Sequence, residues 1–243
     1  EQATREQFGE YVSIYNFRDA IEDGATVPLY YENRIPELQL VNDNFSDELD
    51  ALLEVAELDE DAEGALAREF GTQYTLLTRP ERLKTIASDL VRHFVGRGFS
   101  GKAMYVGLDK AAAVRMYDLV QEAWAEHLAE LRRQHDALPE LERPWLASRI
   151  ELMETTDMAV VVSQSQNELK TLDNLGLDIR PHRERMNRED LAEKFKDASD
   201  PLRLVFVCAM WMTGFDAPSV STVYLDRPMK NHTLMQTIAR ANR

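Results

Sequence analysis

Three short apolar runs constrain the fold of this chain more than any other feature of its sequence. They cover residues 103–108, 158–162 and 204–208. Successive residues in each run are largely apolar, whereas a strand with one wet face would alternate, so both faces of each strand should be buried. Segments of helical period lie between the runs. This alternation predicts an α/β fold, with a parallel sheet covered by helices on both faces.

The segments between the strands carry helical signals. We predict helices over residues 83–94, 111–135 and 187–196, and Pro144 should interrupt the pattern after the second. The first helix follows a capping-box pattern, Thr78–Glu81, with a proline in its first turn. The residues expected to face the core are Tyr117, Val120, Trp124, Leu128 and Leu131 in the second helix, and Leu191 and Phe195 in the third.

A polar turn and a second short strand follow the last apolar run. The turn comes after Cys208 and carries Thr213, Gly214 and Asp216, and residues 222–225 form the next strand-like run. Taken alone, the glycine can be a turn residue and the aspartate can close a turn before the following proline. A role in binding therefore has to rest on what surrounds them.

The chain ends in a segment of helical period. Asn231 can cap a helix over residues 233–243. One face of that helix carries Leu234, Ile238 and Ala241, and the opposite face carries Gln236, Arg240 and Arg243. Two guanidinium groups held together suit phosphate, because each can donate two hydrogen bonds. A plain amphipathic helix with a solvated basic face is the alternative.

The order of these features resembles motifs V and VI of superfamily 2 helicases. Residues 213–218 read TGFDAP and residues 236–243 read QTIARANR. From about Asp178 onward the sequence is similar to one family in particular, the motor (R) subunit of type I restriction enzymes. Ala239 stands where helicases usually have glycine, and it is small enough for the same close packing. The resemblance implies a RecA-like lobe, the second of two in a motor.

The resemblance also implies roles for the nucleotide-facing residues. Arg243 would contact the γ-phosphate as an arginine finger, with Arg240 beside it. Gln236 would couple the nucleotide to the cleft, and Asp216 would lie near the nucleotide, at the ribose. Gly214 would belong to the same nucleotide-binding set. ATP and Mg²⁺ would be held mainly by the first lobe.

DNA contacts are implied for the polar turn. Thr213 and Gly214 would lie near the DNA backbone, and the motor would step along double-stranded DNA. Further partners implied by the family are the first motor lobe and a nuclease domain of the same parent chain, and the modification and specificity subunits of the complex.

Three regions are expected along the chain. Residues 1–34 would hold the linker from the first motor lobe and an entry strand. Residues 35–77 would form an acidic helical insertion, and residues 78–243 would form the second RecA-like lobe with motifs IV to VI. The run Val106–Asp109 resembles the end of the motif IV strand. Charged runs of the kind seen in the insertion are usually solvated helix faces.

The net charge of −15 argues against a general nucleic-acid-binding surface. The charge is uneven, because residues 43–63 contain ten acidic residues and no lysine or arginine. Residues 180–196 are locally basic, with four arginines, two lysines and His182 against four acids. A local basic face could therefore still contact DNA. For His182 the sequence leaves open a DNA contact or a loop cap.

Two apparent nucleotide motifs fail on context. Residues 96–103 nearly match a phosphate loop, but a helix precedes and a strand follows, which is the reverse of the required order. Residues 59–62 mimic an acidic magnesium box but end a helical run. The five histidines are scattered, and we predict no metal site in this chain. The missing boxes are consistent with half of a motor, and the chain alone should not hydrolyse ATP.

Cysteine content and hydropathy indicate in which cellular compartment the protein is expected. The single cysteine excludes an internal disulfide, which is typical of a reducing cytoplasm. No apolar run is long enough for a membrane span, and the first residues lack the apolar core of a signal peptide. The lack of an initiator methionine suggests a piece of a longer protein. Two alternatives remain at this stage: a lobe of another superfamily 2 DNA helicase, and a non-catalytic binding module with a nucleotide-type fold.

Overall fold

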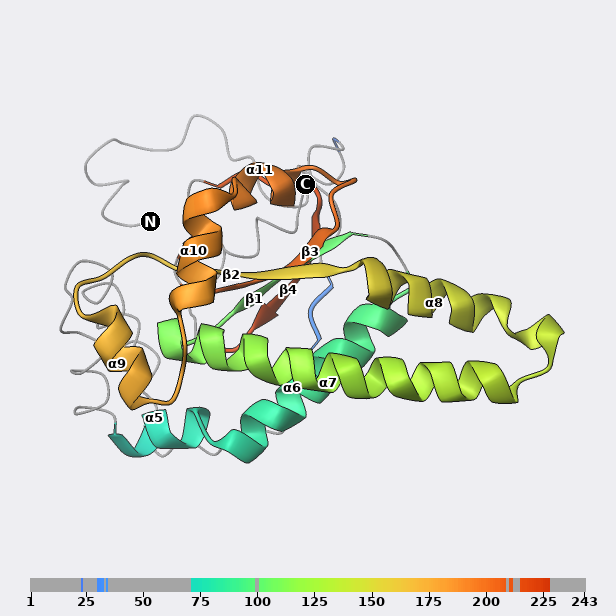
Figure 1. Ribbon diagram of the computed structural model, residues 1–243, viewed down its shortest axis with the longest axis horizontal. Helices are drawn as coiled ribbons and strands as arrows, with labels where there is room; N and C mark the ends of the chain where they lie inside the picture. The colour runs from blue at the N-terminus through green and yellow to red at the C-terminus, as the bar shows by residue number, and fades with distance from the viewer. Residues whose placement is uncertain are drawn as a thin grey trace. The chain divides into compact units, whose positions relative to one another are not determined.

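A computed structural model describes residues 23, 30–32, 34, 71–98, 101–208, 210–211 and 215–227 (Figure 1). The chain divides into two compact units, residues 1–33 with 242–243 and residues 34–241. All helices and strands with described residues lie in the second unit. Several predictions fall outside the described residues: the acidic helix before residue 71, most of the entry strand, and the helix over 233–243.

Four parallel strands form one sheet in the order β2-β3-β1-β4. Their bounds are Lys102–Val106 for β1, Asp157–Val161 for β2, Leu202–Val207 for β3 and Val220–Leu225 for β4. The predicted strands are confirmed, with ends that shift by up to two residues. Strand β1 stops before Gly107 because the chain turns there into the cap of the next helix.

Helices surround this sheet (Figure 1). Their bounds are Gly71–Leu77 for α5, Pro80–Gly96 for α6, Lys110–Ala137 for α7, Pro144–Thr155 for α8, Glu168–Asn174 for α9, Arg180–Arg188 for α10 and Leu191–Lys196 for α11, with a 3₁₀ turn η1 at Glu140–Glu142. Helices α6, α7 and α8 contribute side chains to the cluster on one face, and α11 contributes to the cluster on the other. The prediction of a doubly covered parallel sheet is therefore confirmed, consistent with a RecA-like fold.

Alternate residues of the strands divide between the two hydrophobic clusters. In β3, Leu204 and Phe206 pack with α6 to α8, whereas Val205 and Val207 pack with α11. All four are fully buried. A strand with two buried faces has no room for a polar residue in either direction, which is why these runs are continuously apolar.

Helix α10 protects the free edge of β2. Arg183 donates to the carbonyl oxygen of Val162 at 3.1 Å, and Arg185 donates to that of Met158 at 2.8 Å. These carbonyls are four residues apart, so they point to the same side of the strand. An exposed strand edge invites pairing with other chains, and the two guanidinium groups satisfy it instead.

Two details of the predicted helices were wrong. The Thr78 hydroxyl donates back to the Tyr74 carbonyl at 2.8 Å and does not cap α6, whose N-cap position is Arg79. The predicted helix over 187–196 is interrupted, because α10 ends at Arg188 and the Asp190 carboxylate caps a new helix by accepting from Glu193 N at 3.0 Å. The inward positions of α11 are confirmed, since both of its predicted core residues are buried.

Candidate functional site

The carboxyl ends of the parallel strands lie along one edge of the sheet, and the loops there form the candidate site. Ligands of open α/β sheets bind beyond this edge. Asp216, in the connection from β3 to β4, is the predicted site residue that the structure describes. The other predicted site residues lie outside the described residues: Thr213, Gly214, Gln236, Arg240 and Arg243.

Asp216 is exposed between two anchored neighbours. Phe215 and Ala217 are buried, at 9% and 5% exposure. The Phe215 ring stacks on Trp211 at a centroid distance of 4.3 Å, and on Phe195 of α11 at 6.4 Å. Both flanking side chains are buried in the core, which fixes the backbone of Asp216. Its carboxylate therefore lies on the surface at a defined position.

A lysine lies on the aromatic stack beside this loop. Lys196 Nζ is 5.5 Å from the centroid of the Phe215 ring and donates to Glu193 at 2.7 Å. The pKa of Lys196 is raised, mainly by the hydrogen bond to Glu193, with Asp216 among the smaller electrostatic causes. The immediate surroundings of Asp216 therefore contain a cation on the same side of the sheet.

A buried polar network underlies the carboxyl edge at β4. The carboxylate of Asp226, which directly follows β4, accepts hydrogen bonds from Arg82 of α6 and from the Tyr105 hydroxyl of β1, the latter at 2.7 Å. Burial raises the pKa of Tyr105 well above its ordinary value, and the charge of Asp226 adds to this. The tyrosine therefore stays protonated and acts as a donor.

A second carboxylate opens helix α7 at the same edge. Asp109 Oδ1 accepts from Ala112 N at 2.6 Å, and Oδ2 accepts from the Tyr74 hydroxyl at 2.6 Å. The resemblance of Val106–Asp109 to the motif IV strand end is consistent with this position, but the observed role of the aspartate is that of a helix cap.

Sequence reasoning missed the residues that follow β4. Asp226 and Arg227 are 8% and 9% exposed, although charged residues are seldom buried without partners. The available signal was a pair of opposite charges placed directly after an apolar strand, at the edge where the site was expected.

His182 is partly buried and packs within the lobe. Its ring lies edge-on to Tyr117 of α7, at 4.6 Å between centroids. Burial lowers its pKa. The contact packs α10 against α7, and the two roles left open by the sequence stay predictions.

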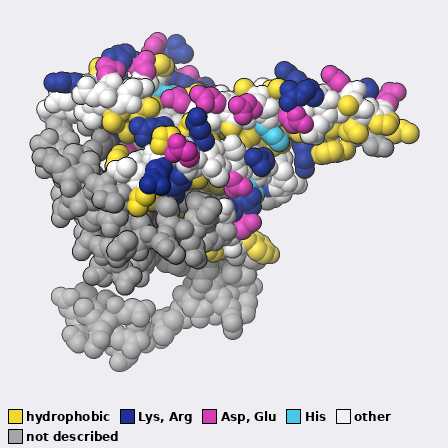
Figure 2. All heavy atoms as spheres, turned by 90° about the horizontal axis from the view of Figure 1, so that it is seen from below, with side chains coloured by type: hydrophobic (Ala, Val, Ile, Leu, Met, Phe, Trp, Pro, Cys, Tyr) yellow, Lys and Arg dark blue, Asp and Glu magenta, His cyan; other side chains and the backbone are white. Residues whose placement is uncertain are grey.

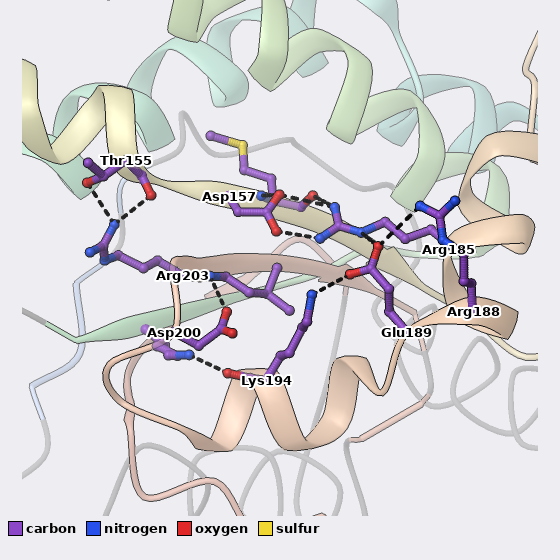
Figure 3. Close-up of polar contacts among 11 residues, drawn as sticks. Thr155, Asp157, Arg185, Arg188, Glu189, Lys194, Asp200 and Arg203 are labelled. Atoms are coloured by element: carbon purple, nitrogen blue, oxygen red, sulfur yellow. Dashed lines mark hydrogen bonds and ion pairs between the residues drawn. The ribbon is translucent and has the colours of Figure 1, made fainter.

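The basic charges of residues 180–196 are largely paired within the lobe. Figure 3 shows Arg185 bonded to Asp157, and Lys194 bonded to Glu189 at 2.6 Å, near the amino end of β2. Arg188, which is 72% exposed, has acidic neighbours 3.8 and 3.9 Å away. The face of the molecule seen in Figure 2 also has basic and acidic side chains interspersed. The local excess of basic residues therefore does not make a uniform positive face.

The segment around residues 96–103 does not have the element order of a phosphate loop. Helix α6 precedes and strand β1 follows the segment around residues 96–103, so the predicted rejection of a phosphate loop is confirmed. Lys102 is 1% exposed and donates to the carbonyl oxygen of Lys194 at 2.7 Å, which leaves it directed into the protein.

Within the described part of the chain, no three His, Cys, Asp or Glu side chains gather as metal ligands.

The parallel sheet with a helical layer on each face defines an α/β domain consistent with a RecA-like fold. A family model described as type I restriction enzyme subunit R domain 3 matches residues 102–243, and a SWI2/SNF2 ATPase model matches residues 1–63. The first match covers more than half of the chain. The chain belongs to the type I restriction enzyme R subunit family.

Curated relatives agree with this assignment. The type I restriction enzyme HindI endonuclease subunit of Haemophilus influenzae is 36% identical over 248 residues, which is 100% of this chain and 20% of that protein. The putative type I restriction enzyme MjaIXP endonuclease subunit of Methanocaldococcus jannaschii is 31% identical over 239 residues, 97% of this chain and 20% of that protein. The chain thus spans about a fifth of the length of these relatives. Among the described helices, none has the length and apolar character needed to cross a membrane.

Proposed function

We propose that this chain is the second motor lobe of an ATP-dependent double-stranded DNA translocase in a type I restriction-modification complex. One observation carries the proposal. The connections that follow β3 and β4 leave the same edge of the sheet, and only β1 separates the two strands. The first connection carries Thr213, Gly214 and Asp216, and the second leads to Gln236, Arg240 and Arg243. The match of residues 1–63 to an ATPase model supports ATP as the nucleotide.

The proposed roles of the nucleotide-facing residues follow from the charges of their side chains and of the phosphates. Arg243 would meet negative charge that develops on the γ-phosphate, and Arg240 would stand beside it. Gln236 would sense the nucleotide, with Asp216 at the ribose and Gly214 allowing close approach. The described part of this lobe offers no cluster of metal ligands. We assign Mg²⁺ and most contacts to ATP to the first lobe, where the metal would neutralise phosphate charge.

The proposed output is movement of DNA. Thr213 and Gly214 would contact the backbone, which fits a sequence-independent motor because phosphate contacts carry no base information. Closing of the two lobes on ATP and opening after hydrolysis would advance the duplex. The partners would be the first lobe and nuclease domain of the parent chain, and the modification and specificity subunits.

The test is DNA-stimulated ATP hydrolysis by the full-length parent with and without Arg243→Ala. A loss of about a hundredfold or more in kcat, with nucleotide binding largely kept, would place Arg243 at the developing charge. Arg203→Ala is a matched control, because Arg203 lies on β3 near the opposite edge and donates to Thr155 O at 3.0 Å. An unchanged rate in Arg243→Ala would reject the finger role and favour a non-catalytic binding module.

The isolated chain supplies a second test. We expect no DNA-stimulated ATP hydrolysis from residues 1–243 alone, because the proposed active site needs groups from both lobes. Measurable turnover by the purified chain, abolished by Arg243→Ala, would contradict the two-lobe proposal.

A further inference from the structure

The ends of three neighbouring strands are joined to one another at the carboxyl edge. Gly107 N, just past β1, donates to Val207 O of β3 at 2.8 Å. Asp226 N, just past β4, donates to Val106 O of β1 at 2.9 Å. These two bonds continue the β1–β3 and β1–β4 pairings by one residue beyond the ends of the strands.

One side chain links the two outer strands of these three. Arg227 follows β4, and its Nη1 donates to the carbonyl oxygen of Cys208, which follows β3, at 2.9 Å. Strands β3 and β4 are not neighbours, because β1 lies between them. The arginine therefore reaches across the end of β1 to hold a backbone atom two strands away.

The residue that precedes Arg227 is held by hydrogen bonds to two other elements. The preceding carboxylate, Asp226, is tied to Arg82 of α6 and to Tyr105 of β1. Arg227 is 9% exposed. A buried guanidinium that donates to a main-chain carbonyl forms a short, stiff link between two backbone segments.

We infer that Arg227 is a positioning residue for the motor reaction, and this inference rests on the function proposed above. Cys208 begins the segment with Thr213, Gly214 and Asp216, and Arg227 begins the segment with Gln236 and Arg240. The link sets the first residues of both segments at a fixed separation. The arginine acts by holding the starting points of two segments that must meet one nucleotide.

The experiment uses the full-length parent with Arg227→Met, Arg227→Lys and the control Arg203→Met, whose arginine also donates to a backbone carbonyl. We expect Arg227→Met to lower kcat for DNA-stimulated ATP hydrolysis by about tenfold to a hundredfold, with KM for ATP changed less than about threefold. Arg227→Lys should recover part of the loss, because an ammonium can donate to the same carbonyl. The control should keep the parental kcat.

A double-mutant cycle separates positioning from general damage. If Arg227 acts through the segment that carries Arg240, then Arg227→Met should cost little further in an Arg240→Ala background. Equal losses in both backgrounds would overturn the inference, as would an unchanged kcat in Arg227→Met or no recovery by lysine. Failure of the proposed function would show separately, as an unchanged rate in Arg243→Ala.

Discussion

Arg183 and Glu168 form a two-point ion pair, with Nε to Oε1 at 2.9 Å and Nη2 to Oε2 at 2.8 Å. Their side chains are 15% and 7% exposed. The same guanidinium donates to the carbonyl oxygens of Val162 and Ser163. One arginine of α10 thus fixes both the exit of the edge strand β2 and the first residue of α9.

Arg183→Met should be strongly destabilising, because it leaves the Glu168 carboxylate buried without its cation. Breaking a buried pair from one side costs about 3–5 kcal/mol of unfolding free energy. The measurement is urea unfolding of the chain, followed by circular dichroism.

The exposed pair Arg132–Glu154 supplies the control, with side chains 57% and 46% exposed. Arg132→Met should cost less than about 1 kcal/mol, since surface pairs are largely screened by water. Equal losses for the two methionine variants would show that the inner pair is no more important than a surface contact.

Gly107→Ala should destabilise the lobe at the carboxyl edge. A Cβ at Gly107 would lie 3.1 Å from Tyr105 Cε1 and 3.3 Å from Ala113 N. Neither atom can retreat easily, because the Tyr105 ring is fully buried and the other atom is helix backbone. We expect a loss of about 1–3 kcal/mol, as for other overpacked sites.

Gly96→Ala is the matched substitution. Nothing lies within 4 Å of its added Cβ, and the residue is the last of α6. Removing glycine's freedom in the unfolded chain should stabilise by about 0.4–1 kcal/mol. Chemical unfolding of both variants decides the point, and a stabilised Gly107→Ala would contradict the close packing.

The sheet could be predicted from the sequence because burial on both faces leaves a direct mark. A strand that is buried on both faces must be apolar at successive residues, and the runs around Val106, Val160 and Phe206 show this pattern. Helix α7 could also be predicted, since its long stripe packs on the sheet. Three of its five predicted core residues are buried and the other two are partly buried.

Helix α10 could not be predicted in the same way. Its sequence, RPHRERMNR, has no apolar period and none of its residues is buried. Hydrogen bonds from Arg183 and Arg185 to the edge strand hold it in place, and such tertiary contacts leave no local pattern. Helix α8 was missed for another reason. Pro144, interpreted as an interruption, is its first residue, where a missing amide hydrogen costs nothing.

The candidate site was only partly accessible to sequence reasoning. The position of Asp216 in the loop after β3 follows from the motif order, and the structure places it there. The link from Arg227 to Cys208 could not be foreseen, because it depends on strand order. Strands β3 and β4 flank β1, which places their ends two strands apart and within reach of the arginine side chain.

Tyr105→Phe should lower stability and change its dependence on alkaline pH. The variant removes a donor from the buried Asp226 carboxylate, which should cost about 1–3 kcal/mol. The Tyr105 pKa is raised in the folded state by burial. Its contribution is therefore complete below the ordinary tyrosine pKa of about 10 and is lost as the pH rises above that value.

Unfolding free energies measured between about pH 8 and 11 test this sign. The parental chain should lose stability more steeply above pH 10 than Tyr105→Phe. Tyr30→Phe, at a position 95% exposed, should follow the parental curve. Parallel curves for the parent and Tyr105→Phe would mean that the hydroxyl is not held protonated by the fold.

His182 predicts a loss of stability on the acid side. Burial against Tyr117 lowers its pKa below the ordinary value of 6.5, although Asp178 opposes this and Arg185 adds to it. At a pH between the folded and unfolded pKa values, His182 is therefore protonated in the unfolded chain and neutral in the folded chain. The stability contributed by neutral His182 is complete above about pH 6.5 and is lost as the pH falls through the folded pKa.

His182→Asn should therefore flatten the stability curve between about pH 7 and 5, a window chosen to lie above the titration of most carboxylates. The measurement is urea unfolding at fixed ionic strength across this range. If the slope in His182→Asn equals that of the parent, the imidazole must accept its proton without leaving its place against Tyr117, and the packing of α10 on α7 would not depend on its neutral form.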